Sequence, residues 1–578
     1  MTTLTLSSAS GQPTLIDDLC PGSQGSIPSF KNVMMDGYAY FAADDCTHGM
    51  ELWRTDGTSS GTEMVADIFE GPSGSSPKSL FNMEGTLFFS ANDGKYGTEL
   101  WKFDPGTGKA EMVADIASGG DSSTPRNLIR FQDMLYFYAS LPSLGHELWR
   151  SDGTEQGTVL IKEIYPGPIS TLKHDMLVVD DLLYFWGDDP THGRELWRSD
   201  GTETGTHVLM DIFPGSQSAL ILGPPWTLYT LSHRITTQLT RIGDRVFFFA
   251  SDGISGAELW ASDGTKEGTV LVKDINPGPA SSYPSELVDM GDYLFIVATD
   301  ASNGRELRAL NAQSFDEIVF DVNPGNADSS PNWITPTKDD IVFFSADDGT
   351  HGRELWSLNE KKELTLVADI NRGTNDSTPG NIFYDDRPNS SSNDGILLFT
   401  ANDGTFGKEL WASYLNSPFN AFMVHEFWGG RAGSFAFVNF TRLGSHVAFT
   451  AIAGGVGSEL FRLEVGNPGS PFVNFNDENI GLDIASPQET PTEFTLSQNY
   501  PNPFNPSTVI DFTLRESTQV RLSVFDMLGR EVRTLVDGNL SKGHHQVTFR
   551  ADDLPSGSYL YRMVTSEFTS TRIMHLAK

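Results

Sequence analysis

Basic residues and cysteine are scarce in this chain. Its 578 residues include 39 Lys and Arg against 76 Asp and Glu, which gives a net charge of −37 at pH 7. A surface with this excess of carboxylates repels polyanions, so nucleic acid is excluded as a partner. Two cysteines exclude four-cysteine zinc sites, iron–sulfur clusters and a disulfide scaffold.

Long apolar runs are also absent. No stretch approaches the ~20 apolar residues of a transmembrane segment. The N-terminal leader, residues 1–13, lacks the basic region and apolar core of a secretory signal, so we expect no signal peptide in this chain. No helical periodicity is sustained either. Aromatic residues make up 11% of the chain, with 56 Gly and 31 Pro, which is typical of an all-β protein with many turns.

What the sequence does contain is a repeat. Glu-Leu-Trp, or a close variant, recurs nine times at a basic period of 48 residues. The nine copies begin at Glu51, Glu99, Glu147, Glu195, Glu258, Glu306, Glu354, Glu409 and Glu459. A fixed period of this length indicates a repeat architecture.

Each unit contains four short segments rich in β-branched and aromatic residues, bounded by Gly, Asp or Pro. In the second unit we expect strands at 79–83, 87–91, 99–103 and 111–116. Four strands in 48 residues predict one blade of a β-propeller. The alternative is an open β-solenoid.

The two ends of the repeat favour a closed ring. The chain enters with a lone fourth-type strand at 13–19 and leaves after a third-type strand at 459–465. The first strand would therefore complete the last blade and remove exposed edges. We predict a single large propeller of about nine four-stranded blades over residues 14–465; the alternative is a ring in which the sixth or ninth unit is absorbed differently.

Four units continue into Asp-Gly-Thr-x-x-Gly-Thr, at 56–62, 152–158, 200–206 and 263–269. With Glu-Leu-Trp, this resembles the bacterial ELWxxDGT repeat family, which implies an extracellular setting but no catalytic residues. Arg308 and Phe461 depart from the pattern by replacing the Trp. We interpret the Asp-Gly-Thr segments as structural turns and the Trp residues as packing between blades.

The repeated Glu is the most uniform position. We expect it to accept hydrogen bonds from the Gly-rich loop that precedes it, which would lower its pKa. The alternative is calcium, with Asp93 and Glu99 or Asp348 and Glu354 as ligands. No other cofactor is expected.

Two further loop features lead to predictions. His48, His192 and His351 recur as Thr-His-Gly, and because they lie far apart around the ring we expect solvated histidines rather than one zinc site. Cys20 and Cys46 fall in loops on the same face of the first blade, where a disulfide would pin the closing strand; two free thiols are the alternative.

An apolar insertion between the fourth and fifth units is the candidate contact for a ligand or partner. The interval between Asp211 and Val246 is longer than in the other units and includes residues 222–229, with Pro224, Pro225, Trp226 and Tyr229. An exposed aromatic insertion on a rigid scaffold is where binding is expected. A loop folded over the ring for packing is the alternative.

The C-terminal part has a different pattern. Residues 466–492 are rich in Gly, Pro and Asn and are interpreted as a linker. Residues 493–578 contain alternating segments at 509–514, 520–526, 531–536, 545–550 and 558–564, which predict a small Ig-like β-sandwich.

This domain carries Leu-Ser-Gln-Asn-Tyr-Pro-Asn-Pro-Phe-Asn-Pro-Ser at 496–507, Met-Leu-Gly-Arg at 527–530, Leu-Pro-Ser-Gly at 554–557 and a terminal Lys578. It resembles the type A C-terminal sorting domain of the type IX secretion system. The resemblance implies recognition by the outer-membrane translocon and a sortase-like peptidase. Its motif residues correspond here to Asn502, Pro503, Asn505, Pro506, Gly529, Arg530, Gly557 and Lys578.

Together these features predict a secreted or cell-surface protein whose propeller is a non-enzymatic binding or scaffold module for an unidentified glycan or protein. No nucleophile with a base and an orienting group stands out from the repeat. Two alternatives remain: a polysaccharide hydrolase or lyase with its site in the propeller channel, and a structural surface-layer component.

Overall fold

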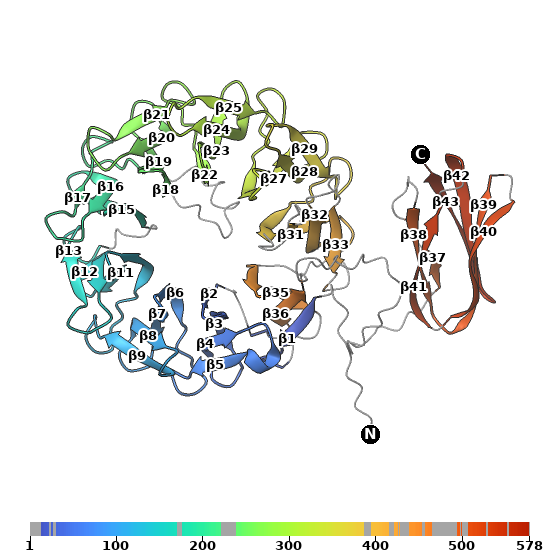
Figure 1. The fold of residues 1–578 in the computed structure, drawn as a ribbon, viewed down its shortest axis with the longest axis horizontal. Coiled ribbons are helices and arrows are strands. Elements are labelled where there is room, and N and C mark those ends of the chain that lie inside the picture. Colours follow the sequence, from blue (N-terminus) through green and yellow to red (C-terminus); the bar gives the residue numbers. More distant parts are fainter. Residues whose placement is uncertain are drawn as a thin grey trace. The chain divides into compact units, whose positions relative to one another are not determined.

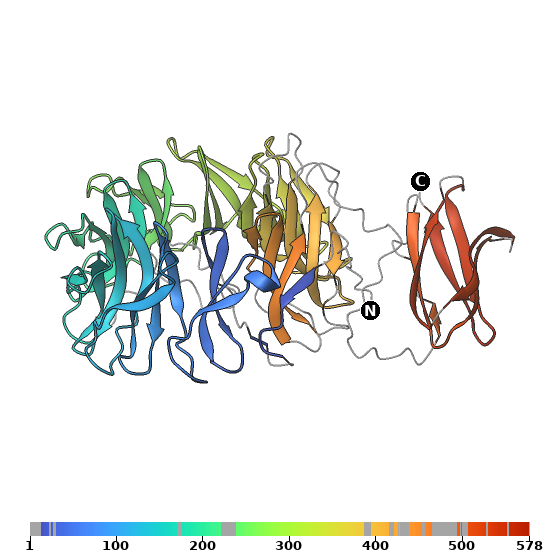
Figure 2. The ribbon, with the colours of Figure 1, turned by 60° about the horizontal axis from the view of Figure 1, so that its bottom comes forward.

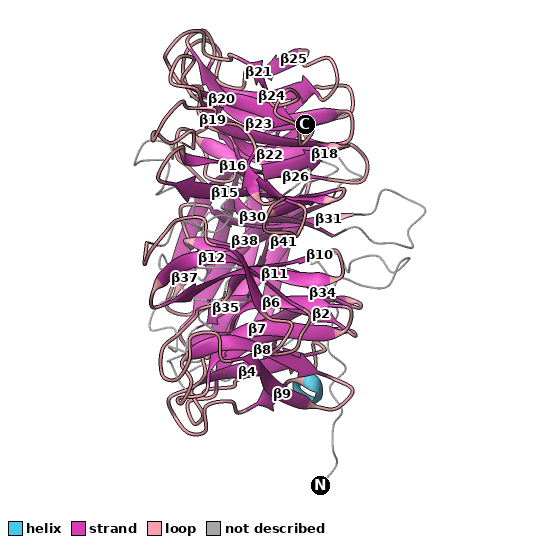
Figure 3. Cartoon of the chain, turned by 90° about the vertical axis from the view of Figure 1, so that its left-hand side faces the viewer, coloured by secondary structure: helices cyan, strands magenta, loops and turns pink. Residues whose placement is uncertain are grey.

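The computed structural model describes residues 13–21, 25–26, 31–169, 176–220, 239–385, 395–414, 421–425, 427, 439–453, 457–464, 494–496, 499, 507–527, 530–540, 542–551 and 554–576. The chain divides into two compact units, residues 1–480 and 481–578. Strands dominate both, and a short 3-10 turn, η1 (Ser59–Gly61), is the one helical element among these residues (Figure 3).

The first unit is a ring of nine antiparallel four-stranded sheets, counted over the described residues (Figure 1). Blade 1 comprises β2 (Val33–Met35), β3 (Tyr38–Asp44), β4 (Met50–Thr55) and β5 (Glu63–Ala66). Blade 2 comprises β6 (Lys78–Met83), β7 (Thr86–Asn92), β8 (Thr98–Asp104) and β9 (Lys109–Ala114). Blade 3 comprises β10 (Arg126–Phe131), β11 (Met134–Leu141), β12 (Leu144–Ser151) and β13 (Val159–Lys162). Blade 4 comprises β14 (Leu177–Val179), β15 (Leu182–Asp189), β16 (Gly193–Ser199) and β17 (His207–Val208). Blade 5 comprises β18 (Leu239–Ile242), β19 (Arg245–Ser251), β20 (Ala257–Ser262) and β21 (Val270–Lys273). Blade 6 comprises β22 (Ser285–Met290), β23 (Tyr293–Asp300), β24 (Gly304–Asn311) and β25 (Glu317–Phe320). Blade 7 comprises β26 (Asn332–Pro336), β27 (Val342–Asp347), β28 (Arg353–Leu358) and β29 (Leu364–Ala368). Blade 8 comprises β30 (Gly380–Asp385), β31 (Ile396–Asn402), β32 (Lys408–Tyr414) and β33 (Ala421–His425). Blade 9 comprises β34 (Thr441–Leu443), β35 (His446–Ala453), β36 (Gly457–Glu464) and β1 (Thr14–Asp17).

The N-terminal strand closes the ring, as predicted. β1 pairs antiparallel with β36, with Leu15 opposite Phe461. The sixth and ninth units each form a complete four-stranded blade, so the alternative in which one of them is absorbed elsewhere is wrong. Within each blade the first strand is innermost, and Figure 2 shows the strands running through the thickness of the ring.

The hydrophobic core of the ring lies between blades. Nine apolar clusters fill the nine interfaces, including the one that joins blade 9 to blade 1, where Ile16 and Leu460 pack against Phe41 and Trp53. All seven repeated Trp residues belong to these clusters or pack against them, which confirms the predicted packing role. Flat rings of this size fill the wedge between neighbouring sheets.

Arg308 shows how the sixth blade tolerates the loss of its Trp. The Arg308 side chain is 1% exposed and is paired with Asp300 and Glu317 at 2.5 and 2.8 Å. Its Nε donates to the carbonyl of Ala298, as the indole N–H of Trp149 donates to the carbonyl of Ala139. The buried guanidinium is tolerated here because two carboxylates and a carbonyl accept its hydrogen bonds.

The second unit is a two-sheet sandwich. One sheet has the order β37 (Thr495–Leu496), β38 (Ser507–Leu514) and β41 (Gly543–Arg550), and the other has β40 (Glu531–Leu540), β39 (Thr518–Asp526), β42 (Gly557–Val564) and β43 (Thr569–Leu576). All five strands predicted for this region are present. β37 and β43 were not predicted, although Met574 and Leu576 of β43 alternate with exposed residues and are buried.

No helix in the described parts of the chain is long and apolar enough to cross a membrane.

Candidate binding face and sorting domain

A buried glutamate lies at or near the start of the third strand in every blade. All nine are 0% exposed. In blade 5, Glu258 accepts hydrogen bonds from the backbone N–H groups of Ile275 and Ser282 at 2.9 and 2.8 Å, and from the Ser282 hydroxyl at 2.5 Å. These donors lie between β21 and β22, so the glutamate of one blade fixes the loop that enters the next.

The predicted partner of this glutamate was therefore wrong. The Gly-rich loop that precedes it is closed by its own aspartate: Asp252 Oδ1 accepts from the backbone N–H groups of Ile254 and Ser255. The glutamate reaches the other loop on the same face, because the following blade brings that loop against it.

The predicted direction of the pKa was also wrong. Burial raises the pKa of Glu258 and Glu354 to about 7, although the hydroxyl and backbone donors pull it down. Glu195 reaches about 8. It accepts from the backbone N–H groups of Ile212 and Phe213, and Ala219 takes the place of the serine that supplies a hydroxyl in other blades. Burial dominates because a carboxylate loses its hydration inside the ring.

The calcium candidates are all engaged in these local contacts. Asp93 accepts from the backbone N–H groups of Lys95 and Tyr96, and Asp348 is paired with His351. Glu99 and Glu354 hold the loops to the next blades. Within the described residues no three His, Cys, Asp or Glu side chains gather to hold a metal. Calcium at these residues stays a prediction.

The Asp-Gly-Thr turns join neighbouring blades. The glycine carbonyl of each turn accepts a hydrogen bond from a basic residue on the third strand of the preceding blade. The pairs are Arg462 with Gly57, Lys102 with Gly153, Arg150 with Gly201, and Arg198 with Gly264. Blades 5 to 8 have Ala261, Ala309, Ser357 and Ala412 at the basic position, and each is followed by a blade that lacks the turn.

This inter-blade contact was not predicted, although the sequence carries its signal. Wherever a unit carries the Asp-Gly-Thr turn, the preceding unit has a basic residue three positions after its repeated Glu. The basic residue thus goes with the turn of the next unit and not with the turn of its own unit. Arg54 is the exception: the next blade has no turn, and Arg54 pairs with Glu63 of its own blade.

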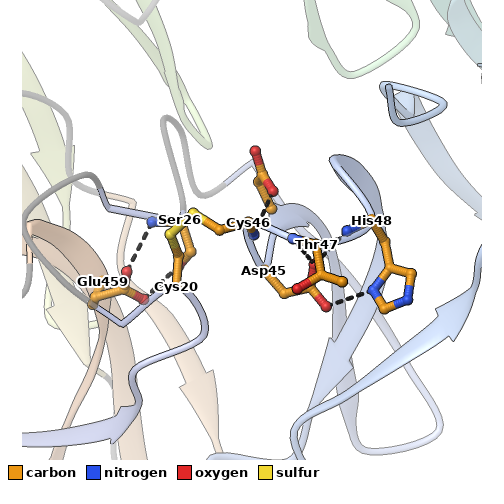
Figure 4. Close-up of a disulfide and its surroundings, with 8 residues drawn as sticks. Cys20, Ser26, Asp45, Cys46, Thr47, His48 and Glu459 are labelled. Atoms are coloured by element: carbon orange, nitrogen blue, oxygen red, sulfur yellow. Dashed lines mark hydrogen bonds and ion pairs between the residues drawn. A yellow bond between two sulfur atoms is a disulfide. The ribbon is translucent and has the colours of Figure 1, made fainter. Parts of the chain in front are cut away.

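Three ties hold the ring closed beside β1 (Figure 4). A disulfide joins Cys20, which follows β1, to Cys46 in blade 1, with Cα atoms 5.3 Å apart. The backbone N–H of Ser26 donates to Glu459 at 2.8 Å, and the Ser26 hydroxyl donates to the same carboxylate. Gly25 has a φ of 71°, and an added Cβ would lie 2.3 Å from the Ser458 nitrogen, so only glycine fits.

The predicted binding residues Pro224, Pro225, Trp226 and Tyr229 lie outside the described residues. The last described residue before them, Leu220, is buried with Ala219 between blades 4 and 5. The described chain therefore stops before the insertion at a blade interface, in the loop after β17 that Glu195 holds.

In the sandwich, the motif residue Asn499 is an internal anchor, whereas Arg530 and Gly557 are exposed. Asn499 is 2% exposed; its backbone N–H donates to the Tyr561 hydroxyl at 2.7 Å and its amide donates to Thr508 at 2.9 Å. Arg530 closes the turn after β39 through two hydrogen bonds to Asp526. Gly557 begins β42 with a φ of 155°. The remaining predicted motif residues, Asn502, Pro503, Asn505, Pro506, Gly529 and Lys578, lie outside the described residues.

Residues 498–574 match the family model of the secretion system C-terminal sorting domain. The chain thus carries a sorting domain, which indicates export to the cell surface or the medium by the type IX system. No curated protein matches the chain.

Solved structures that resemble the chain do so distantly. They include PorZ, a bacterial surface component of the type IX secretion system of Porphyromonas gingivalis, with a TM-score of 0.28 and 10% identity over 95% of this chain and 86% of that one. A prolyl endopeptidase has a TM-score of 0.35 and 10% identity over 66% and 55%, and a puromycin-hydrolyzing peptidase of Mycobacterium tuberculosis has 0.34 and 9% over 76% and 61%. The chain spans little more than half the length of these two peptidases. At such TM-scores none of the three bears on function.

Proposed function

We propose that the ring is a non-enzymatic binding or scaffold module that the type IX system exports through the sorting domain at residues 493–578. The observation that carries the proposal is the match of residues 498–574 to a secretion sorting domain. The translocon and a sortase-like peptidase would be the partners of that domain. The likeness of residues 14–465 to ELWxxDGT repeats supports an extracellular setting.

A binding role is supported by how the ring uses its polar groups. The carboxylates of the repeat hold the loops that enter the next blades. These contacts make that loop face rigid, and a rigid face with variable loop residues suits recognition of a surface glycan or protein.

Export can be tested with the full chain behind a heterologous signal peptide in a host with a type IX system. We expect the full chain on the cell surface or in the medium, and a chain truncated before residue 493 in the periplasm. Asn499→Ala with Tyr561→Phe removes the internal anchor of the sorting domain and should reduce export, whereas Arg130→Ala on the ring surface should not. Equal export of the full and truncated chains would refute the proposal.

Binding can be tested with the exported full chain on arrays of surface polysaccharides. We expect retention on one polymer class without release of new reducing ends. Release of reducing ends would instead establish a hydrolase.

A further inference from the structure

A half-buried lysine in blade 8 carries a charge that no described residue balances. Lys408 stands at the start of β32, directly before the repeated Glu409. Its ammonium makes no hydrogen bond or ion pair with the part of the chain that the structure describes. Burial lowers the pKa of Lys408, and no nearby carboxylate counteracts this effect. Such a charge costs folding free energy, which indicates a role other than stability.

The equivalent positions in the two preceding blades show how the fold satisfies a cation there. Arg305 in blade 6 donates to the carbonyl of Tyr283 at 2.9 Å. Arg353 in blade 7 donates to the carbonyl of Ser330, also at 2.9 Å. Burial lowers the pKa of both arginines, but carboxylates near each of them counteract it. Lys408 thus departs from two neighbours that the ring itself neutralises.

The end of Lys408 lies beside a glycine at the inner rim of the ring. Gly380 is the first residue of β30, the innermost strand of blade 8 (Figure 1). A Cβ added to Gly380 would lie 3.4 Å from Nζ of Lys408 and 3.1 Å from Nε1 of Trp333. The φ of Gly380 is not left-handed, so the close approach of these two side chains, and not the backbone, favours glycine. Four other innermost strands have a side chain at this register position, namely Lys78, Arg126, Ser285 and Asn332.

Trp333 and Asn381 occupy matching bulges in the neighbouring strands β26 and β30. Trp333 has a φ of 58°, which bulky residues rarely adopt, and Asn381 has a φ of 49°. A bulge re-aims a side chain. The Asn381 amide donates to the Thr400 hydroxyl at 3.4 Å. The rim between blades 7 and 8 therefore combines an ammonium, the edge of an indole and an amide.

We propose that this rim binds an acidic sugar residue of a surface glycan, with its carboxylate on the ammonium of Lys408. The proposal rests on the binding role proposed for the ring and names its ligand class. A carboxylate is the charged acceptor that the ammonium lacks. The indole and the amide suit the apolar faces and the hydroxyls of a sugar.

Two further observations fit this ligand. The loop that enters β30 is held by Glu354, which accepts from the backbone N–H of Ser377, so the site adjoins the rigid loop face. The net charge of −37 repels a dense polyanion, so the glycan would carry isolated carboxylates.

Binding of methyl glucuronide to the full chain, followed by saturation-transfer NMR, is the first test. Methyl glucoside has the same ring without the carboxylate and should bind at least about tenfold more weakly, since it cannot accept a charged hydrogen bond. N-acetylglycine supplies a carboxylate without a sugar. If it binds as well as the glucuronide, the site recognises a peptide carboxyl terminus and the sugar class is wrong.

Lys408→Met separates a binding role from a structural one. It should abolish glucuronide binding and leave the melting temperature unchanged or higher, because it removes an unpaired buried charge. Arg353→Met is the matched control at the equivalent position and should lower the melting temperature, because it removes the donor to Ser330.

Gly380→Ala tests the space beside the ammonium with Lys408 intact. The added Cβ crowds Lys408 and Trp333, so glucuronide binding should weaken severalfold. Gly120→Ala is the control, because a Cβ there meets no atom within 4 Å, and it should leave binding unchanged.

The proposal is overturned if the glucuronide does not bind, if Lys408→Met still binds it, or if Lys408→Met lowers the melting temperature as much as Arg353→Met. Equal retention of the wild type and Lys408→Met on the same polysaccharide would overturn this site and leave the binding role of the ring in place. Retention of neither on any polysaccharide would count against the binding role itself.

Discussion

The ring and the sorting sandwich handle charge in opposite ways. Residues 493–578 contain nine acidic and nine basic residues, so the whole net charge of −37 belongs to residues 1–492. Nine carboxylates are fully buried in the ring, whereas among the described residues of the sandwich no Asp, Glu, Lys or Arg is buried. The ring uses carboxylates as internal ties between blades, while the sandwich relies on an apolar core and one amide anchor, Asn499.

The largest expected effect comes from removing one buried tie. Glu258→Ala leaves the backbone N–H of Ile275 without an acceptor and leaves the N–H and hydroxyl of Ser282 only their longer bonds to the carbonyl of Ala257, at 3.2 and 3.4 Å, which should cost about 3 kcal/mol of the free energy of unfolding of the ring. Hydrogen exchange in the full chain would show faster exchange at β21 and β22.

The matched change in the sandwich is Glu531→Ala, whose carboxylate faces solvent beside Arg521. We expect a much smaller loss there than from Glu258→Ala, because water screens a solvent-exposed carboxylate. Equal losses in the two regions would contradict the distinction between internal and surface carboxylates.

A loss of similar size should follow from opening the ring closure. Replacing Cys20 and Cys46 by serine removes a link across 26 residues, which should cost about 3 kcal/mol through the entropy of the unfolded chain. Urea unfolding with and without reductant measures it, and hydrogen exchange should rise in β1 and β36 but not in the sandwich. A reductant-insensitive wild type would argue against the closure role.

The pH dependence of the ring should follow its buried glutamates. The pKa values of about 7 for Glu258 and Glu354, and of about 8 for Glu195, lie above the value near 4.3 of an unfolded chain. The folded ring then binds more protons, so these groups stabilise it fully below about pH 4 and lose that contribution as pH rises toward 8.

Ala219→Ser sharpens this test because it gives Glu195 the hydroxyl donor that other blades have. The added donor should lower the pKa of Glu195 and stabilise the ring at pH 8 by about 1 kcal/mol. Unfolding curves at pH 5 and pH 8 measure both effects. In the sandwich, hydrogen bonding to Thr534 lowers the pKa of Glu531, so that group acts in the opposite direction. A ring that gains stability between pH 5 and pH 8 would refute the assignment.

A smaller effect is expected at the contact between turns. Arg150→Ala removes the donor to the Gly201 carbonyl and should cost about 1 kcal/mol. Arg130→Ala is the control: it removes exposed ion pairs with Asp133 of the same blade and with Glu84 of the preceding blade, and it should leave the unfolding curve nearly unchanged. Thermal unfolding of the two variants separates them; indistinguishable curves would mean that the turn contact contributes nothing.

The smallest effect concerns calcium. Because Glu99 and Glu354 already accept several donors, millimolar calcium should leave the melting temperature of the chain unchanged. A clear rise that is lost in Asp348→Asn would instead support the calcium site predicted from the sequence.

Much of the fold could be predicted because short-range sequence patterns specify it. The period of the repeat predicts the blades, the strand before Cys20 predicts ring closure, and alternation predicts five of the seven sandwich strands. The sandwich strands β37 and β43 were not predicted, because β37 is two residues long and β43 buries two of its eight side chains.

The site was less predictable. Asp252 and Glu258 lie six residues apart, yet one closes its own loop and the other holds the loop to the next blade. Loop identity in the sequence does not say which carboxylate meets which donor, because that depends on how one sheet is placed against the next.

By itself, the amino-acid sequence determined the number of blades, the strand that closes the ring and the presence of a sorting domain, since short-range patterns and chain ends carry that information. Only the tertiary structure decided where the repeated glutamates find their donors, that burial raises the pKa of Glu195, Glu258 and Glu354, and that three Asp–His pairs recur every third blade. Those properties depend on distances between segments that ring closure brings together, and on the water that packing removes.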